Sequence, residues 1–233
     1  MKNNIFVIDI DGTLIKGQSQ RYFIAFLKEK SIVSFLAYIR IMTWFILYKF
    51  HLAKNSNKIL SFALEGFKGK SVASVNLTTD EFITQVVHPL YFKNSKTLIS
   101  MLQSLGYQII LLSSAVEIIV QAIAKDLNVS DYICTKVKTE NGLYTGEVEG
   151  VQVYGEQKRV YLEQYLSTKS LKLDQVTVIA DHISDIPLLK SAKYALVANP
   201  DTKMYTWAQK NNIPMIYLDS DESIQYVESH IVS

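Results

Sequence analysis

The sequence predicts an α/β fold, a mostly parallel sheet with helices on both faces and an all-helical segment inserted after the first strand. Two observations lead to this prediction. From residue 90 onward, short apolar runs alternate with helical patterns, which is typical of βα units. Residues 17–89 follow an apolar run at 5–8 and show a helical pattern without strand alternation. We therefore expect a core formed by residues 1–16 and 90–233, and a helical cap formed by residues 17–89.

The first strand is expected over Lys2–Ile10, because Ile5–Ile8 is a continuous apolar run that stops at acidic residues and a glycine. Asn141-Gly142 lies between extended stretches within 133–150 and predicts a hairpin. The remaining core helices are expected over 95–105, 116–127, 156–166, 184–191 and 202–210, and the remaining core strands over 107–112, 176–180, 194–198 and 214–218.

Composition excludes several classes of protein. Hydrophobic residues make up 48% and charged residues 20% of the 233 residues, which is ordinary globular usage and argues against a disordered or collagen-like chain. The net charge is only +2, and arginine occurs only at Arg21, Arg40 and Arg159, so we expect no nucleic-acid partner. The single cysteine, Cys134, and the absence of a signal-peptide pattern indicate a cytoplasmic protein.

Polar side chains follow three strands of the predicted sheet, at the point where each strand ends. Parallel strands bring their carboxyl ends to one edge of a sheet, so these groups are expected to meet there. Carboxylates held close together raise each other's pKa unless a cation lies among them, and Mg²⁺ prefers oxygen ligands. The residues are Asp9 and Asp11 after the first strand, Ser113 after the second, Asp181 and Asp185 after 176–180, and Lys158 at the start of a helix.

In this order and spacing, the chain resembles the haloacid dehalogenase (HAD) superfamily. Asp9-Ile10-Asp11-Gly12-Thr13-Leu14 matches the DxDGT signature of that superfamily, and Ser113, Lys158 and the stretch 181–185 match its second, third and fourth motifs. The stretches 141–146 and 155–158 are similar to the phosphoserine-phosphatase-like branch, subfamily IB. The resemblance implies a HAD-like Rossmannoid sheet with a helical cap inserted after the first motif.

The resemblance also implies a magnesium-dependent phosphomonoester hydrolase with a phosphorylated small molecule or lipid as substrate. Asp9 would be the nucleophile that forms an aspartyl-phosphate, because a carboxylate is already ionised at neutral pH. Asp11 would be the general acid and base.

The family pattern assigns the other site residues by position. Mg²⁺ would be held by Asp9, by the backbone carbonyl of Asp11 and by Asp181. Asp185 would orient Lys158 or a metal-bound water. The phosphoryl oxygens would be held by Ser113, Lys158 and backbone N–H groups near Gly12 and Thr13.

Two positions depart from the family pattern. His182 stands where serine or asparagine is commoner, so the surroundings of the metal are expected to differ. Gln18 stands where relatives that hydrolyse phosphoserine carry a glutamate for the ammonium group of the substrate. Neutral glutamine supplies no such charge, which argues against phosphoserine. Gln18 and Arg21 remain candidates for substrate contact.

Residues 32–52 are apolar on all sides of the expected helix except for Arg40 and a few scattered polar positions. Such a helix is buried or meets lipid. A single membrane crossing is excluded, because it would place Asp9 and Asp181 on opposite sides of the bilayer. The segment packs within the protein or in a homodimer, lies at the membrane surface, or forms a re-entrant hairpin. Some members of this branch that dephosphorylate phosphatidylglycerophosphate resemble it in having an unusually apolar cap, and a membrane-associated cap favours a lipid phosphate as substrate.

Two other functions stay open on the same fold. A phosphotransferase is one, because an aspartyl-phosphate does not dictate its acceptor. The other is a binding scaffold without activity.

Overall fold

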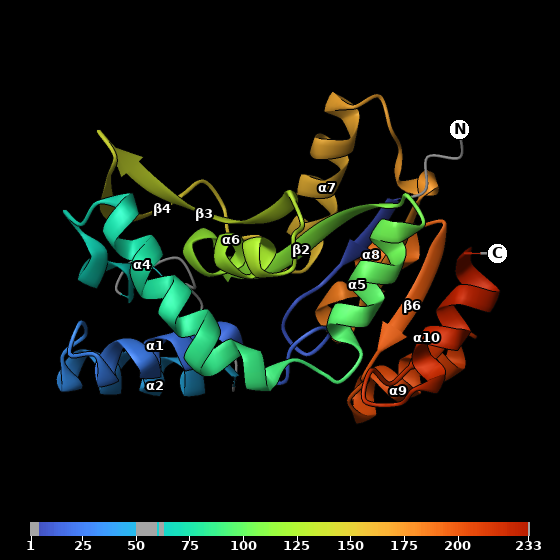
Figure 1. Ribbon diagram of the computed structural model, residues 1–233, viewed down its shortest axis with the longest axis horizontal. Coiled ribbons are helices and arrows are strands. Elements are labelled where there is room, and N and C mark those ends of the chain that lie inside the picture. The colour runs from blue at the N-terminus through green and yellow to red at the C-terminus, as the bar shows by residue number, and fades with distance from the viewer. Residues whose placement is uncertain (1–4, 50–59, 61–62, 233) are drawn as a thin grey trace.

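A seven-stranded sheet forms the centre of the protein, in the order β4-β3-β2-β1-β5-β6-β7 (Figure 1). The computed structural model describes residues 5–49, 60 and 63–232, with the side chains of 44–49 left aside. β1 (Ile5–Ile8) lies in the middle and pairs in parallel with β2 (Gln108–Val116) and with β5 (Val176–Ala180). The predicted α/β fold is confirmed.

The outer strands extend the sheet on both sides of this centre. β6 (Tyr194–Ala198) and β7 (Met215–Ile216) continue it in parallel beside β5. On the other side, β3 (Asp131–Glu140) is parallel to β2 and antiparallel to β4 (Leu143–Glu149). The hairpin predicted from Asn141-Gly142 is therefore confirmed, and its first strand also belongs to the main sheet.

Helices cover both faces of the sheet because successive β1 side chains point to opposite faces. Phe6 and Ile8 belong to one apolar cluster, and Ile5 and Val7 belong to the other. The first face is covered by α5 (Ser95–Ser104), α6 (Glu117–Asp126) and α10 (Glu222–Val227), and the second by α7 (Glu156–Thr168), α8 (Ile186–Ser191) and α9 (Thr202–Lys210).

The cap helices are α1 (Ser19–Glu29), α2 (Phe35–Lys49) and α4 (Val72–Phe82). They lie at one end of the molecule, and the β3–β4 hairpin lies at the same end, next to α4 (Figure 1). Side chains of α1, of α4 and of the turn at Glu65–Phe67 meet in an aromatic group. The ring of Phe23 lies 4.9 Å from that of Phe82 and 5.9 Å from that of Phe67, between centroids. This group is continuous with the cluster on the Phe6 face of the sheet, so the cap helices share a core with the sheet.

The chain enters and leaves the cap helices at two segments that lie side by side. Ile15 forms an antiparallel bridge with Tyr91, and backbone hydrogen bonds join Lys16 N to Leu90 O at 2.8 Å and Phe92 N to Leu14 O at 3.1 Å. These contacts lie next to the boundaries that the sequence predicts at 16/17 and 89/90. The division into core and cap stays a prediction.

The tip of the β3–β4 hairpin forms a second connection to the cap. Gly69 N donates to Tyr144 O at 2.8 Å, Tyr144 N to Lys70 O at 3.0 Å, and Val72 N to Gly142 O at 3.1 Å. Because these bonds are made by the backbone, they fix the direction of the chain that leads into α4.

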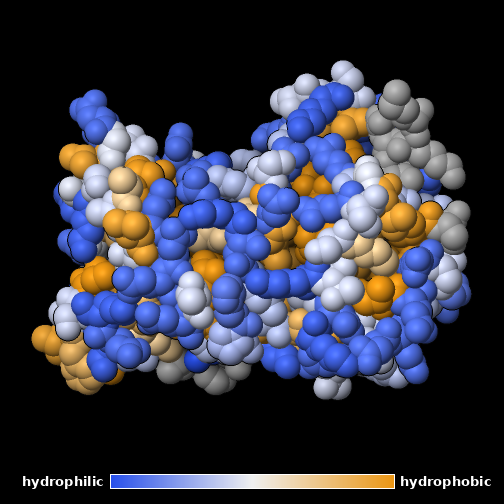
Figure 2. All heavy atoms as spheres, viewed as in Figure 1, coloured by the Kyte–Doolittle hydropathy of each residue, from blue (hydrophilic) through white to orange (hydrophobic). Residues whose placement is uncertain are grey.

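The apolar segment 32–52 contains α2, and residues 50–52 lie outside the described residues. No helix in the described part of the chain is both long enough and apolar enough to cross a membrane. Phe35 is 62% exposed, Leu36 80% and Ile39 44%, whereas Ile41 is buried. The first part of α2, residues 35–43, therefore has one face on the core and an apolar face outside it. Figure 2 shows hydrophobic atoms at this end of the molecule.

Candidate active site

Asp9 lies directly after β1, where the central strand of the sheet ends. Its backbone N–H donates to the carbonyl of Ile179 on β5 at 3.0 Å, which keeps it in register with the neighbouring strand. The side chain is only 7% exposed. Burial raises the pKa of its carboxyl group, Lys158 opposes this rise, and the charge of Asp185 adds to it.

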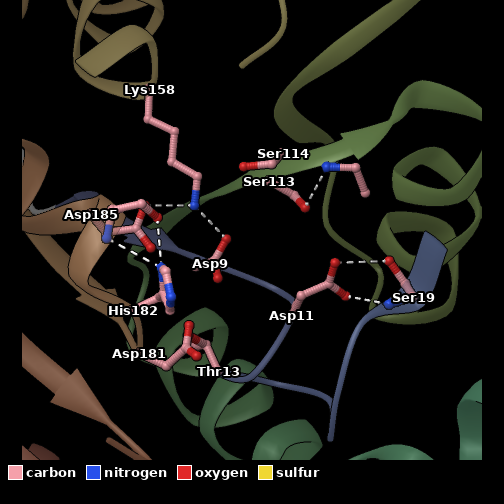
Figure 3. A network of polar contacts seen from close by, with 12 residues as sticks. Asp9, Asp11, Thr13, Ser19, Ser113, Ser114, Lys158, Asp181, His182 and Asp185 are labelled. Carbon is pink, nitrogen blue, oxygen red and sulfur yellow. Dashed lines mark hydrogen bonds and ion pairs between the residues drawn. The ribbon is translucent and has the colours of Figure 1, made fainter. Parts of the chain in front are cut away.

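Lys158 lies between two carboxylates (Figure 3). Its Nζ is 2.8 Å from Oδ1 of Asp9 and 2.8 Å from Oδ1 of Asp185. All three side chains are buried. Burial acts to lower the pKa of the Lys158 ammonium, but the charges of Asp185 and Asp9 outweigh it and raise that pKa. Lys158 is therefore a fixed positive charge beside Asp9, and Asp185 holds it from the other side. Its predicted contact with phosphoryl oxygens stays a prediction.

Asp11 points away from this ion pair and toward the first turn of α1 (Figure 3). One carboxylate oxygen accepts the N–H of Ser19 at 2.8 Å, and the other accepts the Ser19 hydroxyl at 3.1 Å. Burial raises the pKa of Asp11 to about 7, although the Ser19 N–H lowers it in part. Both oxygens are thus oriented by the start of the cap, and the group can exchange a proton near neutral pH.

Gly12 is required by the conformation of the loop that carries Asp11. Its φ is +82°, and a Cβ at this position would lie 2.0 Å from Oδ2 of Asp181. The neighbouring Thr13 is buried and donates its hydroxyl to Oδ1 of Asp181 at 3.2 Å. The N–H of Gly12 donates to the carbonyl of Ile15 at 2.8 Å. That donor is therefore used within the loop and does not join the phosphoryl contacts predicted around Gly12 and Thr13.

Three carboxylates lie close enough to share a metal ion. One oxygen each of Asp9, Asp181 and Asp185 lies within 4.8 Å of the others. Burial raises the pKa of Asp181 to about 9, and the charge of Asp9 adds to this effect. Oδ1 of Asp185 is buried and has no hydrogen bond with proper geometry, although it is ion-paired with Lys158.

This donor set fits a hard divalent cation such as Mg²⁺, because all its ligands are carboxylate oxygens and its excess negative charge is buried. The structure places Asp9 and Asp181 together, as predicted, and adds Asp185 to the candidate ligands. The carbonyl of Asp11 as a ligand stays a prediction.

Ser113 lies where β2 departs from regular pairing. Leu112 pairs with Ile133 and Val116 with Thr135, so three residues of β2 lie opposite one of β3. The sequence predicted that this strand ends at Leu112, and it instead runs to Val116. The buried Ser113 hydroxyl accepts the N–H of Ala115 at 3.1 Å, and a hydroxyl that accepts one bond can still donate its own O–H to a ligand.

The remaining predicted residues lie around this centre. His182 caps the short turn that carries Asp185, since its Nδ1 accepts the N–H of Ser184 at 3.2 Å. Gln18 and Arg21 are exposed at the start of α1, and the contacts of the described residues do not bring them to Asp9. Substrate contact by Gln18 and Arg21 stays a prediction.

Asn199 binds the loop that carries Asp11, and the sequence analysis did not identify it as a site residue. Its Nδ2 donates to the carbonyl of Gly12 at 3.2 Å and to that of Thr13 at 2.9 Å. Its Oδ1 accepts the N–H of Leu218 at 2.8 Å, so the same side chain ties the loop to the end of β7. The φ of Asn199 is +45°, a region that asparagine tolerates better than most residues.

We expect Asn199→Leu to lower the stability of the folded protein by about 1–3 kcal/mol, because two loop carbonyls and one N–H lose their partner. The turnover number should fall with it, since the loop carries Asp11 and Thr13. Asn212→Leu is the matched control, because Asn212 has a φ of +54° but is exposed. Urea unfolding and steady-state kinetics of both variants check this prediction, and equal effects of the two substitutions would contradict it.

Open α/β sheets bind their ligands at the carboxyl ends of their strands, and buried groups with raised pKa values gathered there are typical of an active site. The chain belongs to the haloacid dehalogenase-like hydrolases, because the model of that family matches residues 6–190. The resemblance drawn from the motifs is thereby confirmed.

Similar sequences include proteins named as phosphatases. The chain is 29% identical to a probable phosphatase of Mycobacterium tuberculosis over 157 residues, which cover 67% of this chain and 54% of that protein. It is 32% identical to a phosphoserine phosphatase of Lactococcus lactis over 113 residues, which cover 48% of this chain and 52% of the relative. The chain therefore spans about half the length of these curated relatives.

Solved structures show the same fold. A protein of unknown function from Bordetella pertussis Tohama I superposes with a TM-score of 0.85 at 22% identity, over 94% of this chain and all of the other. A phospho-aspartyl intermediate analogue of phosphoserine phosphatase superposes with a TM-score of 0.64 at 16% identity, over 99% of this chain and all of the other.

Proposed function

We propose that this protein is a magnesium-dependent phosphomonoester hydrolase that works through an aspartyl-phosphate on Asp9. The observation that carries the proposal is the position of Asp9, which is buried at the end of β1 beside Lys158. One of its carboxylate oxygens lies within 4.8 Å of an oxygen of Asp181 and of Asp185, so the three could bind one metal ion. Membership of the family and the names of the relatives support it.

In the first step, a carboxylate oxygen of Asp9 attacks phosphorus, and the ester oxygen leaves with a proton from Asp11. In the second step, Asp11 takes a proton from water, which attacks the phosphorus and releases phosphate from Asp9. Lys158 and Ser113 would hold the phosphoryl oxygens. Mg²⁺, held by Asp9, Asp181 and either the Asp11 carbonyl or Asp185, would offset the negative charge of the substrate and of the carboxylates.

The experiment that tests the function is a phosphate-release screen with Mg²⁺ beside an Asp9→Asn control. The substrates are soluble phosphomonoesters, including phosphoserine, and detergent-dispersed lipid phosphates. Mg²⁺-dependent release that the control lacks supports the proposal, and no release from any substrate would place the inactive scaffold first.

Metal binding should also appear in the stability of the protein. Burial raises the pKa of Asp181 to about 9 in the metal-free protein, so at this group the folded state binds more protons than the unfolded state between about pH 4 and 9, and the raised pKa of Asp9 acts in the same direction. Stability in EDTA should therefore fall as the pH rises, by at most about 1.4 kcal/mol per pH unit for each group. Mg²⁺ should raise the melting temperature most at high pH.

Thermal melts at pH 5.5, 7.0 and 8.5, with EDTA or with Mg²⁺, measure this effect. Asp181→Asn should flatten the dependence on pH in EDTA and reduce the shift caused by Mg²⁺. A melting temperature that Mg²⁺ leaves unchanged at all three pH values would contradict the metal site.

A lipid phosphate at the membrane surface is the second candidate substrate. The exposed Phe35, Leu36 and Ile39 favour it, because apolar side chains on an outer helix face can enter the headgroup region. A homodimer that covers the same face is the competing prediction. The phosphate-release screen distinguishes a lipid substrate from a homodimer when the lipid phosphates are presented in vesicles as well as in detergent.

A further inference from the structure

Thr135 lies on β3, opposite the irregular part of β2 that carries Ser113. Its side chain is fully buried, and the motifs of the sequence do not include it. The Thr135 hydroxyl donates to the carbonyl of Ser114 at 3.1 Å and accepts the N–H of Val153 at 3.1 Å. A single hydroxyl therefore joins β2 to the segment that follows β4.

The Ser114 carbonyl belongs to the same peptide group as the N–H that binds Ser113. The carbonyl of this group accepts the Thr135 hydroxyl, and its N–H, which is that of Ala115, donates to the Ser113 hydroxyl at 3.1 Å. A peptide group is planar, so its carbonyl and its N–H cannot turn independently. The bond from Thr135 therefore fixes the plane of this peptide group, and with it the donor that orients the Ser113 hydroxyl.

The second bond of Thr135 reaches the segment that leads to Lys158. Val153 is buried, and Lys158 follows it in the first turn of α7. The N–H of Lys158 donates to the carbonyl of Gly155 at 3.1 Å, so the helix begins directly after this anchored segment. The two side chains that we expect to hold the phosphoryl oxygens, those of Ser113 and Lys158, are thus connected to the same buried hydroxyl.

We propose that Thr135 is a positioning residue, which orients the Ser113 hydroxyl for the phosphoryl group and fixes its place relative to Lys158. This inference rests on the proposed phosphatase function and adds a residue that acts on the substrate through Ser113. Donors that are oriented before the substrate binds stabilise a phosphoryl group better than donors that must first be ordered. The Thr135 hydroxyl has one proton, and because it accepts the N–H of Val153, that proton stays directed at the Ser114 carbonyl.

The test compares three substitutions of Thr135 by their affinity for inorganic phosphate with Mg²⁺, measured by titration calorimetry. Thr135→Val keeps the shape of the side chain but removes the hydroxyl. It should weaken phosphate binding by about threefold to tenfold, because one oriented hydrogen bond to the phosphate is impaired. Thr135→Ser keeps the hydroxyl and should bind phosphate as tightly as the wild type. Thr135→Ala is a second variant without the hydroxyl, so the result does not depend on whether the valine variant folds.

Thr177→Val is the matched control, because Thr177 is also a buried threonine of the sheet but lies near the amino end of β5. It should leave the phosphate affinity unchanged. A double-variant cycle separates positioning from a general loss of stability. In a protein that already carries Ser113→Ala, Thr135→Val should cost much less phosphate affinity, because the hydroxyl that Thr135 orients is gone. A thermal melt of each sample checks that the folded protein is being compared.

The outcomes separate this inference from the function. If the protein hydrolyses phosphomonoesters but neither Thr135→Val nor Thr135→Ala weakens phosphate binding, the inference is overturned and the phosphatase stays intact. A loss that is equal with and without Ser113→Ala would also overturn it, because the effect would not pass through Ser113. So would a Thr135→Ser variant that loses as much affinity as Thr135→Val. No phosphate release and no phosphate binding by the wild type would overturn both.

Discussion

Asp9→Asn is expected to lower kcat by on the order of 10³-fold or more, because an amide is a poor nucleophile and no aspartyl-phosphate can form. The variant should still fold. The amide has the size of the carboxylate, and Lys158 keeps its ion pair with Asp185 at 2.8 Å. Phosphate release at saturating substrate, together with a thermal melt of the same sample, measures the two quantities separately.

Asp11→Asn gives the informative comparison. It keeps the nucleophile but loses the group that deprotonates water. With an aryl phosphate, whose leaving group departs without a proton, Asp9 should become phosphorylated and the phosphoenzyme should accumulate. Acid quench and mass spectrometry of the peptide that contains residue 9 detect this species. Turnover that survives Asp9→Asn within tenfold would contradict a covalent route through this residue.

The local sequence predicted the parts of the site that stand at strand ends. An apolar run followed by Asp9 and Asp11 needs only strand propensity and parallel pairing to place these carboxylates at the edge of the sheet, and the structure shows β1 between β2 and β5. Ser113 was located in the same way, although its strand continues to Val116. The bulge there depends on the pairing of β2 with β3, which neither segment specifies alone.

Contacts between distant segments could not be predicted in this way. Asn199 lies 187 residues from Gly12 in sequence, and its bonds exist only because β6 and β7 end next to the Asp11 loop. The ion pair of Asp185 with Lys158 also depends on contacts between segments that are distant in the sequence. The sequence offered Asp185 two roles, as a partner of Lys158 or of a metal-bound water. The ion pair of Lys158 with Asp185 at 2.8 Å favours the role of Asp185 as a partner of Lys158. Asp185 also stays among the three carboxylates that could hold a metal ion.

The cap shows a further limit. Its helices were predicted from composition and pattern, but the position of each side chain depends on how α1 packs on β2 and α6. The family pattern directed attention to Gln18 and Arg21, which are exposed, whereas the residue of this turn that binds Asp11 is Ser19. Neighbouring positions on a helix are about 100° apart, so a contact cannot be assigned to one of them before the packing is known.

Lys158→Met is expected to lower the free energy of unfolding by about 3–5 kcal/mol at pH 8, because it leaves the buried carboxylates of Asp9 and Asp185 without their cation. The Lys158 ammonium does not titrate between pH 5.5 and 8, because its pKa is raised in the folded state. The loss should nevertheless depend on pH. Without Lys158 the pKa of Asp9, already raised by burial, rises further, so this carboxyl takes up a proton as the pH falls and the penalty becomes smaller.

Urea unfolding at pH 8 and at pH 5.5, in EDTA, measures both effects. The double variant Lys158→Met/Asp185→Asn is the decisive comparison, because it removes one of the two stranded charges. It should regain part of the lost stability at pH 8, and it should regain less at pH 5.5, where protonation has already removed part of the charge. If the double variant is less stable than the wild type by the full sum of the Lys158→Met effect and the Asp185→Asn effect, each measured alone, the two residues act independently. The ion pair would then not be the reason that Asp9 can stay charged inside the protein.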